Sequence, residues 1–214
     1  MKTKHYSLLG LFVLFLGLMP VSQVNAADLL PPQQAIETAS TQLHTKLQDR
    51  IFTKNFLKVT EYVDDVITPH TDFDRIAALV LGKIWKTAKP DERERFKNEF
   101  KTLLVRTYSR AFVEFKDWNL RFLPLQMESG ATKVMVKTEV LQPGKEPVGV
   151  DYRMVLINGE WKAYDIIIEG VSLVTNYRTT FSNEVQTKGS LNAVIDGLVK
   201  RNAEALAPKT AKNS

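Results

Sequence analysis

Few residues in this sequence have the type and spacing that catalysis needs, and Asp165 is the first to consider. It interrupts the apolar and aromatic run of residues 161–168. A carboxyl group in apolar surroundings can serve as a general base, as it does in some isomerases. The alternative is structural: Tyr152 or a neighbouring backbone amide satisfies the carboxylate, since buried polar groups normally have partners. Glu169 would lie roughly 13 Å away along a strand that rises ~3.3 Å per residue, too far for a catalytic carboxylate pair.

The other reactive residue types form no recognisable catalytic or metal-binding pattern. Outside the N-terminal segment the only histidines are His44 and His70, and neither has the spacing of a zinc motif. Gly170-Val171-Ser172 resembles half of a nucleophile elbow, but Val174 replaces the second glycine, and Ser172 is better interpreted as a helix cap. There is no cysteine and no glycine-rich phosphate loop. The sequence therefore predicts a protein that is not an enzyme and needs no cofactor.

The elements around Asp165 are a predicted hairpin. Two runs rich in β-branched and aromatic residues flank Asn158-Gly159, which is the strongest short signal for a two-residue turn. If the turn is type I′, Ile157 lies opposite Glu160. The cross-strand pairs that follow share one face of the sheet. These pairs are Leu156 with Trp161, Met154 with Ala163, Tyr152 with Asp165, and Val150 with Ile167. Only Asp165 is out of place on this otherwise apolar face.

After this hairpin the hydrophobic period changes from that of a strand to that of a helix. Ser172 can cap a segment in which Val174, Tyr177 and Phe181 recur at helical spacing. The chain is therefore predicted to run from a strand directly into a helix beside the apolar face.

This stretch resembles the MlaC family, also called toluene-tolerance proteins. The residues that carry the resemblance are Val150-Asp151-Tyr152-Arg153, Trp161-Lys162-Ala163-Tyr164-Asp165-Ile166, Glu169-Gly170-Val171-Ser172-Leu173 and Asn176-Tyr177-Arg178, with Leu81-Gly82-Lys83 and Trp85 upstream. The resemblance covers nearly all of residues 27–206. Lys89 departs from the family pattern, because a threonine or serine is more usual at that helix start, and the loss of this cap is expected to cost about 1 kcal/mol.

The first 26 residues have the features of a signal peptide. Lys2 and Lys4 give a basic start, residues 8–19 are apolar, and small residues precede a cleavage point before Ala27. The apolar run is shorter than the ~20 residues that a membrane-spanning helix needs. The expected organisation is a signal peptide at 1–26, one domain at 27–206 and a flexible tail at 207–214.

Composition argues against nucleic acid as a partner. Removal of residues 1–26 takes away Lys2 and Lys4 and leaves 27 basic residues against 24 acidic ones. The basic residues are interspersed with acids, whereas nucleic-acid binders usually carry a clustered basic face. This mild excess is compatible with weak attraction to anionic lipid surfaces.

The pattern along the chain indicates an α+β domain. Apolar periodicity predicts helices over about 31–47, 55–67, 73–86 and from Pro90 past Phe112, then from Ser172 and from Ser190. Strands are predicted at 118–126, 132–141, 148–157 and 160–169, with turns between them. The fold expected is an antiparallel four-stranded sheet wrapped by about six helices. The resemblance implies that this sheet is curved and NTF2-like.

What the resemblance implies for function is phospholipid transport in the periplasm of a Gram-negative bacterium. The protein would act as a monomer and carry glycerophospholipids between an outer-membrane lipoprotein–porin complex and an inner-membrane ABC transporter with an MCE-domain subunit. Acyl chains would occupy an apolar cavity. The candidate lipid-binding residues are Val80, Phe100, Leu104, Tyr108, Val134, Val136, Val150, Tyr152, Met154, Ile167, Val171, Val174 and Tyr177.

Three questions stay open at this point. Arg178 can contact a lipid phosphate, or it can pair with Glu184 or Asp165 as a structural ion pair. The protein can also be an isomerase or hydrolase of NTF2-like shape that uses Asp165. Finally, it can be an exported adaptor that binds no ligand and whose apolar faces are fully packed.

Overall fold

The computed structural model describes residues 29–114 and 117–207. The predicted signal peptide at 1–26 and all but the first residue of the predicted tail lie outside the described residues. The helices are α1 (Pro31–Leu47), α2 (Phe56–Ile67), α3 (Phe73–Leu81), α4 (Lys83–Thr87), α5 (Pro90–Glu114), α6 (Leu173–Lys188) and α7 (Leu191–Leu206), with the 3-10 turns η1 (Phe52–Lys54) and η2 (Thr68–His70). The strands are β1 (Asn119–Phe122), β2 (Lys133–Leu141), β3 (Val148–Ile157), β4 (Glu160–Ile168) and β5 (Val171–Ser172). None of the helices in these ranges is long and apolar enough to cross a membrane.

The helices begin where local sequence signals place their starts. Asp72, Ser172 and Ser190 each accept a hydrogen bond from the backbone N–H three residues later, which confirms the cap predicted at Ser172 and the helix start predicted at Ser190. These bonds satisfy amides that would otherwise lack a partner in the first turn. At Lys89, where no capping side chain is available, the backbone N–H donates instead to Glu92 Oε2 over 2.8 Å.

The predicted helix over 73–86 is wrong in one respect, because it breaks at Gly82 into α3 and α4. Gly82 has φ 53° and ψ −112°, a conformation that residues with a Cβ rarely adopt. The Arg178 side chain lies against this turn, 3.7 Å from the position that a Cβ would occupy. This break raises the count in the described residues to seven α-helices, where about six were expected.

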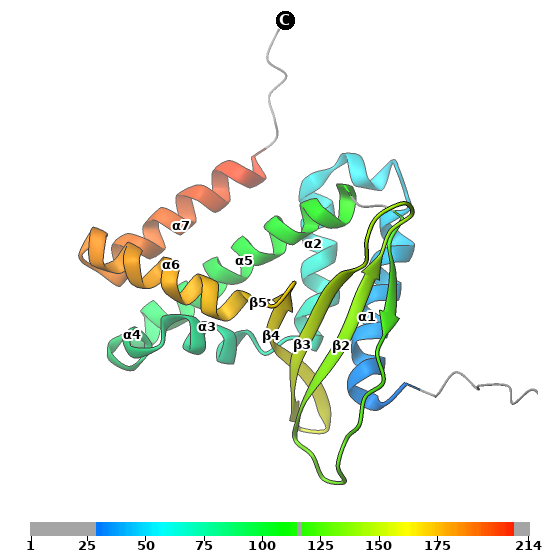
Figure 1. Cartoon of the computed structure of the whole chain (residues 1–214). Helices are drawn as coiled ribbons and strands as arrows, with labels where there is room; N and C mark the ends of the chain where they lie inside the picture. The colour runs from blue at the N-terminus through cyan, green and yellow to red at the C-terminus, as the bar shows by residue number, and fades with distance from the viewer. Residues whose placement is uncertain (1–28, 115–116, 208–214) are drawn as a thin grey trace, which may run out of the picture.

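The sheet is antiparallel, with its strands in chain order from β1 to β5 (Figure 1). It has five strands where four were predicted, because residues 171–172 pair with Ile167 and Ile168 before α6 begins. Two residues are too few to give a periodicity. The first strand is also shorter than predicted, since residues 123–126 are outside β1.

A β-bulge changes the register of the central hairpin. The turn forms as predicted, with Asn158 and Gly159 both at positive φ and Ile157 opposite Glu160. The pairing Met154–Ala163 is also as predicted, but Arg153 then pairs with Asp165, so Tyr164 is an extra residue on β4. Beyond the bulge the predicted pairs are wrong. Tyr152 lies opposite Ile166, and Val150 lies opposite Ile168.

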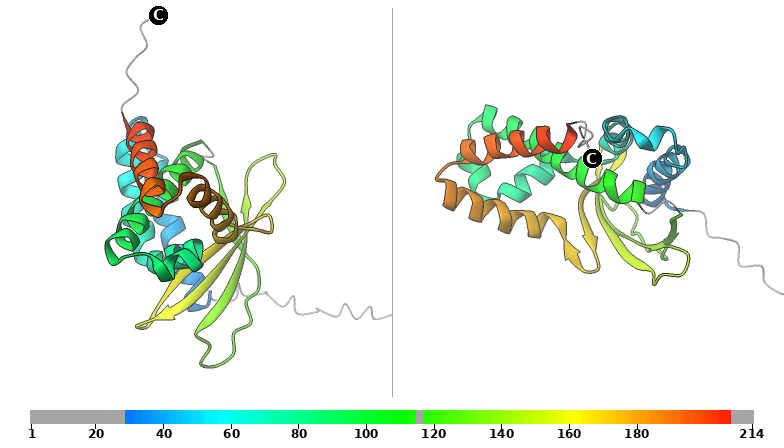
Figure 2. Two further views of the ribbon diagram at one scale, coloured as in Figure 1. Left: turned by 90° about the vertical axis from the view of Figure 1, so that its left-hand side faces the viewer. Right: turned by 90° about the horizontal axis from the view of Figure 1, so that it is seen from above.

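The helices form two groups around the sheet. α1 packs against one face, in contact with β1, β2 and β4, while β2 and β3 are not covered by a helix on the side facing the viewer in Figure 1. The further views in Figure 2 show α3, α4, α6, α7 and the first half of α5 as a helical lobe beside the sheet.

The buried residues form three separate clusters. One fills the helical lobe, around Phe96, Phe100 and Phe181. A second joins α1, α2, the second half of α5 and Trp118. The third lies between α1 and the sheet, around Val136. These clusters do not merge into one core, and a space remains where they meet.

Candidate functional site

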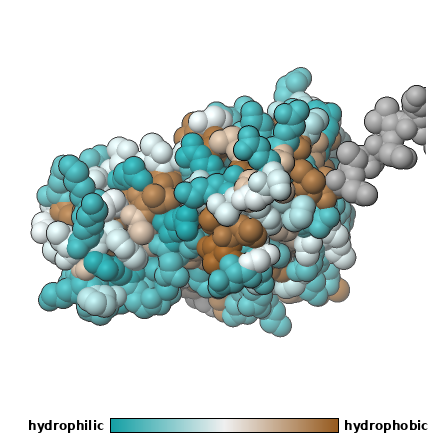
Figure 3. Space-filling view, turned by 90° about the horizontal axis from the view of Figure 1, so that it is seen from below, coloured by the Kyte–Doolittle hydropathy of each residue, from teal (hydrophilic) through white to brown (hydrophobic). Residues whose placement is uncertain are grey.

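An apolar pocket of about 370 Å³ lies where the three buried clusters meet. Each cluster contributes to its wall: Ile76 from the helical lobe, Trp118 from the second cluster and Met154 from the third. The remaining lining residues are Ala35, Ile36, Ala39, Ser40, Leu43, Val63, Ile67, His70, Thr71, Phe73, Leu104, Val105, Tyr108, Ala111, Phe112, Leu120, Val140, Gln142, Val148, Val150, Tyr152, Ala163, Ile166, Ile168 and Leu173. Seen from below, brown patches interrupt a mostly hydrophilic surface where apolar side chains reach it (Figure 3).

The sheet wall of this pocket depends on the β-bulge. Val150, Tyr152 and Met154 alternate along β3 and so share one face, as predicted. After the bulge, Ile166 and Ile168 are the residues opposite Tyr152 and Val150, and both line the pocket. Ile167, which was predicted on this wall, points to the other face of the sheet and lies opposite Asp151.

The helix wall comes mainly from α5, which belongs to two regions of the molecule. Its first half places Phe96 and Phe100 in the helical lobe, where their rings stack at 5.6 Å and both pack edge-on against Phe181. Its second half places Leu104 and Tyr108 on the pocket. One continuous apolar stripe on a 25-residue helix therefore serves a filled core at one end and an unfilled space at the other.

The electrostatic environment of the pocket disfavours charge. Burial raises the pKa of Tyr108 and of Tyr152 to about 12 in each case. Burial also lowers the pKa of His70. Of the nearby charges, Glu160 raises this pKa and Lys162 lowers it, both by less than burial does. All three shifts stabilise the neutral forms, so the few polar groups on this wall present an uncharged surface. Within the described ranges no group of three His, Asp or Glu side chains could hold a metal ion.

The structure brings five of the predicted lipid-binding residues to the pocket: Leu104, Tyr108, Val150, Tyr152 and Met154. The others lie elsewhere. Val80, Phe100, Val174 and Tyr177 pack in the helical lobe, and Val134 and Val136 belong to the cluster beneath α1. Val171 is 57% exposed on β5. Sequence periodicity identified apolar faces correctly in these segments, but neighbouring elements cover the faces.

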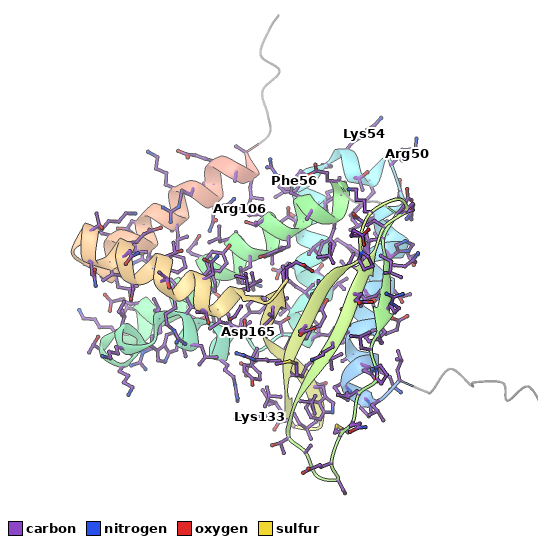
Figure 4. The ribbon with its side chains drawn as sticks, in the orientation of Figure 1. Arg50, Lys54, Phe56, Arg106, Lys133 and Asp165 are labelled. Atoms are coloured by element: carbon purple, nitrogen blue, oxygen red, sulfur yellow. The ribbon has the colours of Figure 1, made fainter. Side chains whose placement is uncertain are left out.

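Asp165 lies on the opposite face of the sheet from the pocket, which corrects the prediction that it faces Tyr152. Its carboxylate is only 2% exposed and accepts three hydrogen bonds: from Arg153 Nη1 at 3.1 Å, from Ser172 Oγ at 2.7 Å and from the Val174 backbone N–H at 3.2 Å. Of the partners expected for it, a backbone amide is present and Tyr152 is not. In Figure 4 Asp165 lies between the sheet and the helical lobe, where it ties β4 to the start of α6.

Arg178 forms neither of the ion pairs that were considered for it. Its Nε donates to the Leu79 backbone carbonyl over 2.7 Å, at the end of α3. Glu184 pairs instead with Lys188 and Arg201. Among the described residues, Arg178 therefore serves the helix break at Gly82, and it is absent from the residues that line the pocket.

Sequence reasoning missed most of the α1 contribution. Ala35, Ile36 and Ala39 line the pocket from the first helix, for which only the range 31–47 was predicted. Trp118 was likewise assigned to a strand rather than to a site. A signal for α1 was present, because positions 35, 36, 39 and 43 recur at the helical period.

Comparison with known proteins establishes the family of this chain. A sequence model of the MlaC protein family matches residues 37–200. The chain belongs to the MlaC family. It is 26% identical to the toluene tolerance protein ttg2D of Pseudomonas putida over 200 residues, covering 92% of this chain and 91% of that protein. It is 24% identical over 124 residues to the intermembrane phospholipid transport system binding protein MlaC of Haemophilus influenzae, which is 56% of each chain.

A solved structure of another protein has a similar fold. The phospholipid-binding protein of Ralstonia solanacearum, solved in complex with a phospholipid, superposes with a TM-score of 0.76 and 29% sequence identity. The match covers 83% of this chain and 100% of that one. The family model thus shows the family, and the solved structure shows a similar fold over most of the chain.

Proposed function

We propose that this protein binds a glycerophospholipid and carries it through the periplasm, with the acyl chains held in the apolar pocket. The observation that carries this proposal is the unfilled space between three buried clusters, lined almost wholly by apolar side chains, in a chain of the MlaC family. The phospholipid-bound relative supports the same class of ligand.

The physical need for such a carrier follows from the hydrophobic effect. Each methylene group shielded from water contributes about 0.8 kcal/mol, so a free phospholipid crosses an aqueous compartment very slowly. The pocket volume of about 370 Å³ is near the lower end of the ~300–1,000 Å³ found for small-molecule sites. Such a space suits acyl chains and leaves the charged headgroup near solvent, where its hydration is retained.

The route that we infer for the protein starts with export. Residues 1–26 would direct it to the periplasm as a signal peptide, and residues 27–206 would act there as a single monomeric domain on a curved NTF2-like sheet, followed by a tail at 207–214. Lipid exchange would involve an outer-membrane lipoprotein–porin complex and an inner-membrane ABC transporter with an MCE-domain subunit. That transporter would supply any ATP chemistry.

The arrangement of Asp165 argues against the isomerase or hydrolase alternative. The carboxylate is not among the residues that line the pocket, and it already accepts hydrogen bonds from Arg153, Ser172 and Val174. A general base must reach the proton that it removes from a substrate. Here the space that a substrate could occupy and the acid lie on opposite faces of one sheet.

Mass spectrometry of the purified protein tests the proposal directly. Protein made in a host with native membranes is analysed under native and then denaturing conditions. We expect a native mass that exceeds the chain mass by one or more phospholipids, and free phospholipid after denaturation. A protein that melts cooperatively, yet is free of phospholipid and does not acquire it from vesicles, would contradict the carrier function.

A further inference from the structure

The connection between α1 and α2 carries the most exposed large apolar side chain of the described residues. Ile51 is 82% exposed, and Leu57, in the first turn of α2, is 46% exposed. A single exposed aliphatic residue is common on protein surfaces and by itself indicates nothing. The surroundings of Ile51 are what distinguish it.

The turn around Ile51 is built to project this side chain outward. Asp49 Oδ1 accepts hydrogen bonds from the backbone N–H groups of Ile51, at 2.9 Å, and of Phe52, at 3.1 Å. These two bonds hold the pKa of Asp49 below its usual value. Phe52 points inward, where its ring packs edge-on against Tyr62 at 5.8 Å and under Lys46 Nζ at 4.5 Å. Because Phe52 is held against the protein, the side chain of Ile51 points to solvent.

Basic side chains surround the projecting isoleucine. Between residues 46 and 58 the basic residues are Lys46, Arg50, Lys54 and Lys58, against the single acid Asp49. Arg110 of α5 adds a fifth, 5.1 Å above the ring of Phe56 at the start of α2. Figure 4 shows Arg50, Lys54 and Phe56 together at one end of the molecule. We call Lys46, Arg50, Ile51, Lys54, Leu57, Lys58 and Arg110 the basic tip.

At the basic tip Asp49 attracts Lys46, whereas the other four cations have no ion-pair partner among the described residues. Arg50, Lys54, Lys58 and Arg110 are exposed and form no ion pair with any described residue. Other basic residues are paired, since Arg95 pairs with Asp196 and Lys101 with Asp64. The tip thus combines unpaired positive charge with exposed aliphatic side chains.

We propose that the basic tip docks the protein on an anionic bilayer surface, with Ile51 and Leu57 inserted among the lipid headgroups. Long lysine and arginine side chains adapt to phosphates in a fluid surface, and an aliphatic residue in their midst enters the interfacial layer. An aliphatic side chain that projects among long, flexible cations fits a deformable bilayer better than a folded partner. Docking goes beyond the proposed carrier function, because it does not require an occupied pocket.

The position of the tip relates it to the candidate site. Leu43 lines the pocket and lies one helical turn before the end of α1 at Leu47, directly before the tip. A protein docked through the tip would hold this pocket wall close to the bilayer. Each basic residue near an anionic surface contributes about fivefold in affinity, or ~1 kcal/mol, and added salt screens this attraction.

Vesicle co-sedimentation of the full mature protein tests the docking. The vesicles are phosphatidylcholine alone, or equimolar phosphatidylglycerol and phosphatidylcholine, at low and high salt. We expect binding to the anionic vesicles only, weakened by salt. Ile51→Asp should reduce it at least about tenfold, because it removes an inserted side chain and adds a repelled charge. The double variant Arg50→Glu with Lys54→Glu should reduce it by more than about 25-fold, or fivefold for each charge removed.

Matched controls make the same chemical changes elsewhere on the surface. Val199→Asp alters an aliphatic residue of α7 that is 42% exposed. The double variant Lys133→Glu with Lys137→Glu alters exposed lysines of β2, and Lys133 lies at the far end of the molecule from the tip (Figure 4). The affinities of the two controls for anionic vesicles should agree within about twofold, once the general effect of their different net charges is subtracted. Both affinities should be far above those of the tip variants.

The following outcomes overturn the docking proposal. The parent protein fails to bind anionic vesicles, it binds neutral vesicles equally well, or the controls lose as much binding as the tip variants. The proposal is equally wrong if tip variants retain vesicle binding but lose binding to an acidic protein. Phospholipid content, measured by mass spectrometry on the same samples, separates the two proposals. Protein that sediments with anionic vesicles, yet carries no phospholipid and acquires none from them, contradicts the carrier function and leaves the docking intact.

Discussion

The adjacent isoleucines Ile166 and Ile167 give the sharpest test of the pocket. The bulge at Tyr164 places Ile166 on the pocket wall and Ile167 on the opposite face. We expect Ile166→Gln to lower phospholipid affinity and Ile167→Gln to leave it nearly unchanged. The two changes are chemically identical and one position apart, so they share nearly every effect except the face on which they act.

The magnitude follows from what the glutamine amide would meet. On the pocket wall it would lie against acyl chains without a hydrogen-bonding partner, which costs about 1–3 kcal/mol by protein mutational data. At 1.4 kcal/mol per factor of ten this is a loss of about 5- to 150-fold in affinity. On the outer face the amide can be hydrated beside Asp151 and Ser172, and the change in affinity should be under about twofold.

The assay is the phospholipid-to-protein ratio of each purified variant, followed by competition for phospholipid with the parent protein. Circular dichroism establishes that both variants are folded. The reasoning about the bulge is wrong if Ile167→Gln empties the protein while Ile166→Gln stays loaded. Equal losses in two folded variants would refute the assignment of opposite faces as well.

Three further predictions concern the charged and polar residues Arg178, Asp165 and His70. Arg178→Ala should lower the unfolding free energy by about 1 kcal/mol, because it leaves the Leu79 carbonyl without its donor, and should leave phospholipid content unchanged. Asp165→Asn should lower the unfolding free energy by about 1.5–3 kcal/mol, measured by urea denaturation, because charge-assisted bonds are lost, while the protein stays loaded. His70→Gln should flatten the dependence of the unfolding free energy on pH. Because burial lowers the pKa of His70, the folded state is favoured above the unfolded pKa of about 6.5, and this contribution is lost as pH falls below that value.

Each of these has an outcome that contradicts it. Loss of phospholipid from folded Arg178→Ala would indicate headgroup recognition by this residue, in place of its structural bond to Leu79. An undiminished urea midpoint for Asp165→Asn would show that the buried bonds contribute little. Equal slopes of stability between pH 7 and pH 5 for the parent and His70→Gln would contradict the burial effect on His70.

Local signals predicted the element starts well because they are satisfied within a few residues. The caps at Asp72, Ser172 and Ser190 and the turn at Asn158 depend only on neighbours in sequence. The family resemblance then predicted how these elements are arranged in the whole fold. The break at Gly82 was missed because its conformation is a property of one backbone position that no periodicity records.

The bulge was missed for a different reason, although its cause was visible in the sequence. With a constant register Asp165 would face the apolar pocket without partners, at a desolvation penalty of several kcal/mol. One extra residue on β4 turns it to the face where Arg153, Ser172 and the Val174 amide meet. These donors come from three elements, so only the assembled fold shows that the Asp165 carboxylate can be hydrogen-bonded on the opposite face. The same shift exchanges Ile167 for Ile166 on the pocket wall.

Helical periodicity likewise identifies an apolar face but not what covers it. Phe100 and Leu104 are one turn apart on the same stripe of α5, and both were predicted to bind lipid. Helix α6 closes over Phe100 through Tyr177 and Phe181, whereas no described element fills the space in front of Leu104. The difference arises from the positions of helices distant in sequence, which pattern arguments do not contain.

A pocket that the side chains leave unfilled has a thermodynamic consequence. A cavity costs about 24 cal/mol for each Å³, so about 370 Å³ of dry space would cost at most ~9 kcal/mol, comparable with the whole stability of a typical domain. The chain has no cysteine, so no disulfide offsets this cost. Instead, each of the three buried clusters also contains residues that pack away from the pocket, and the Asp165 network joins sheet to helix outside it. On the proposed function, acyl chains complete the interior that the side chains leave open, so the ligand acts as part of the hydrophobic core.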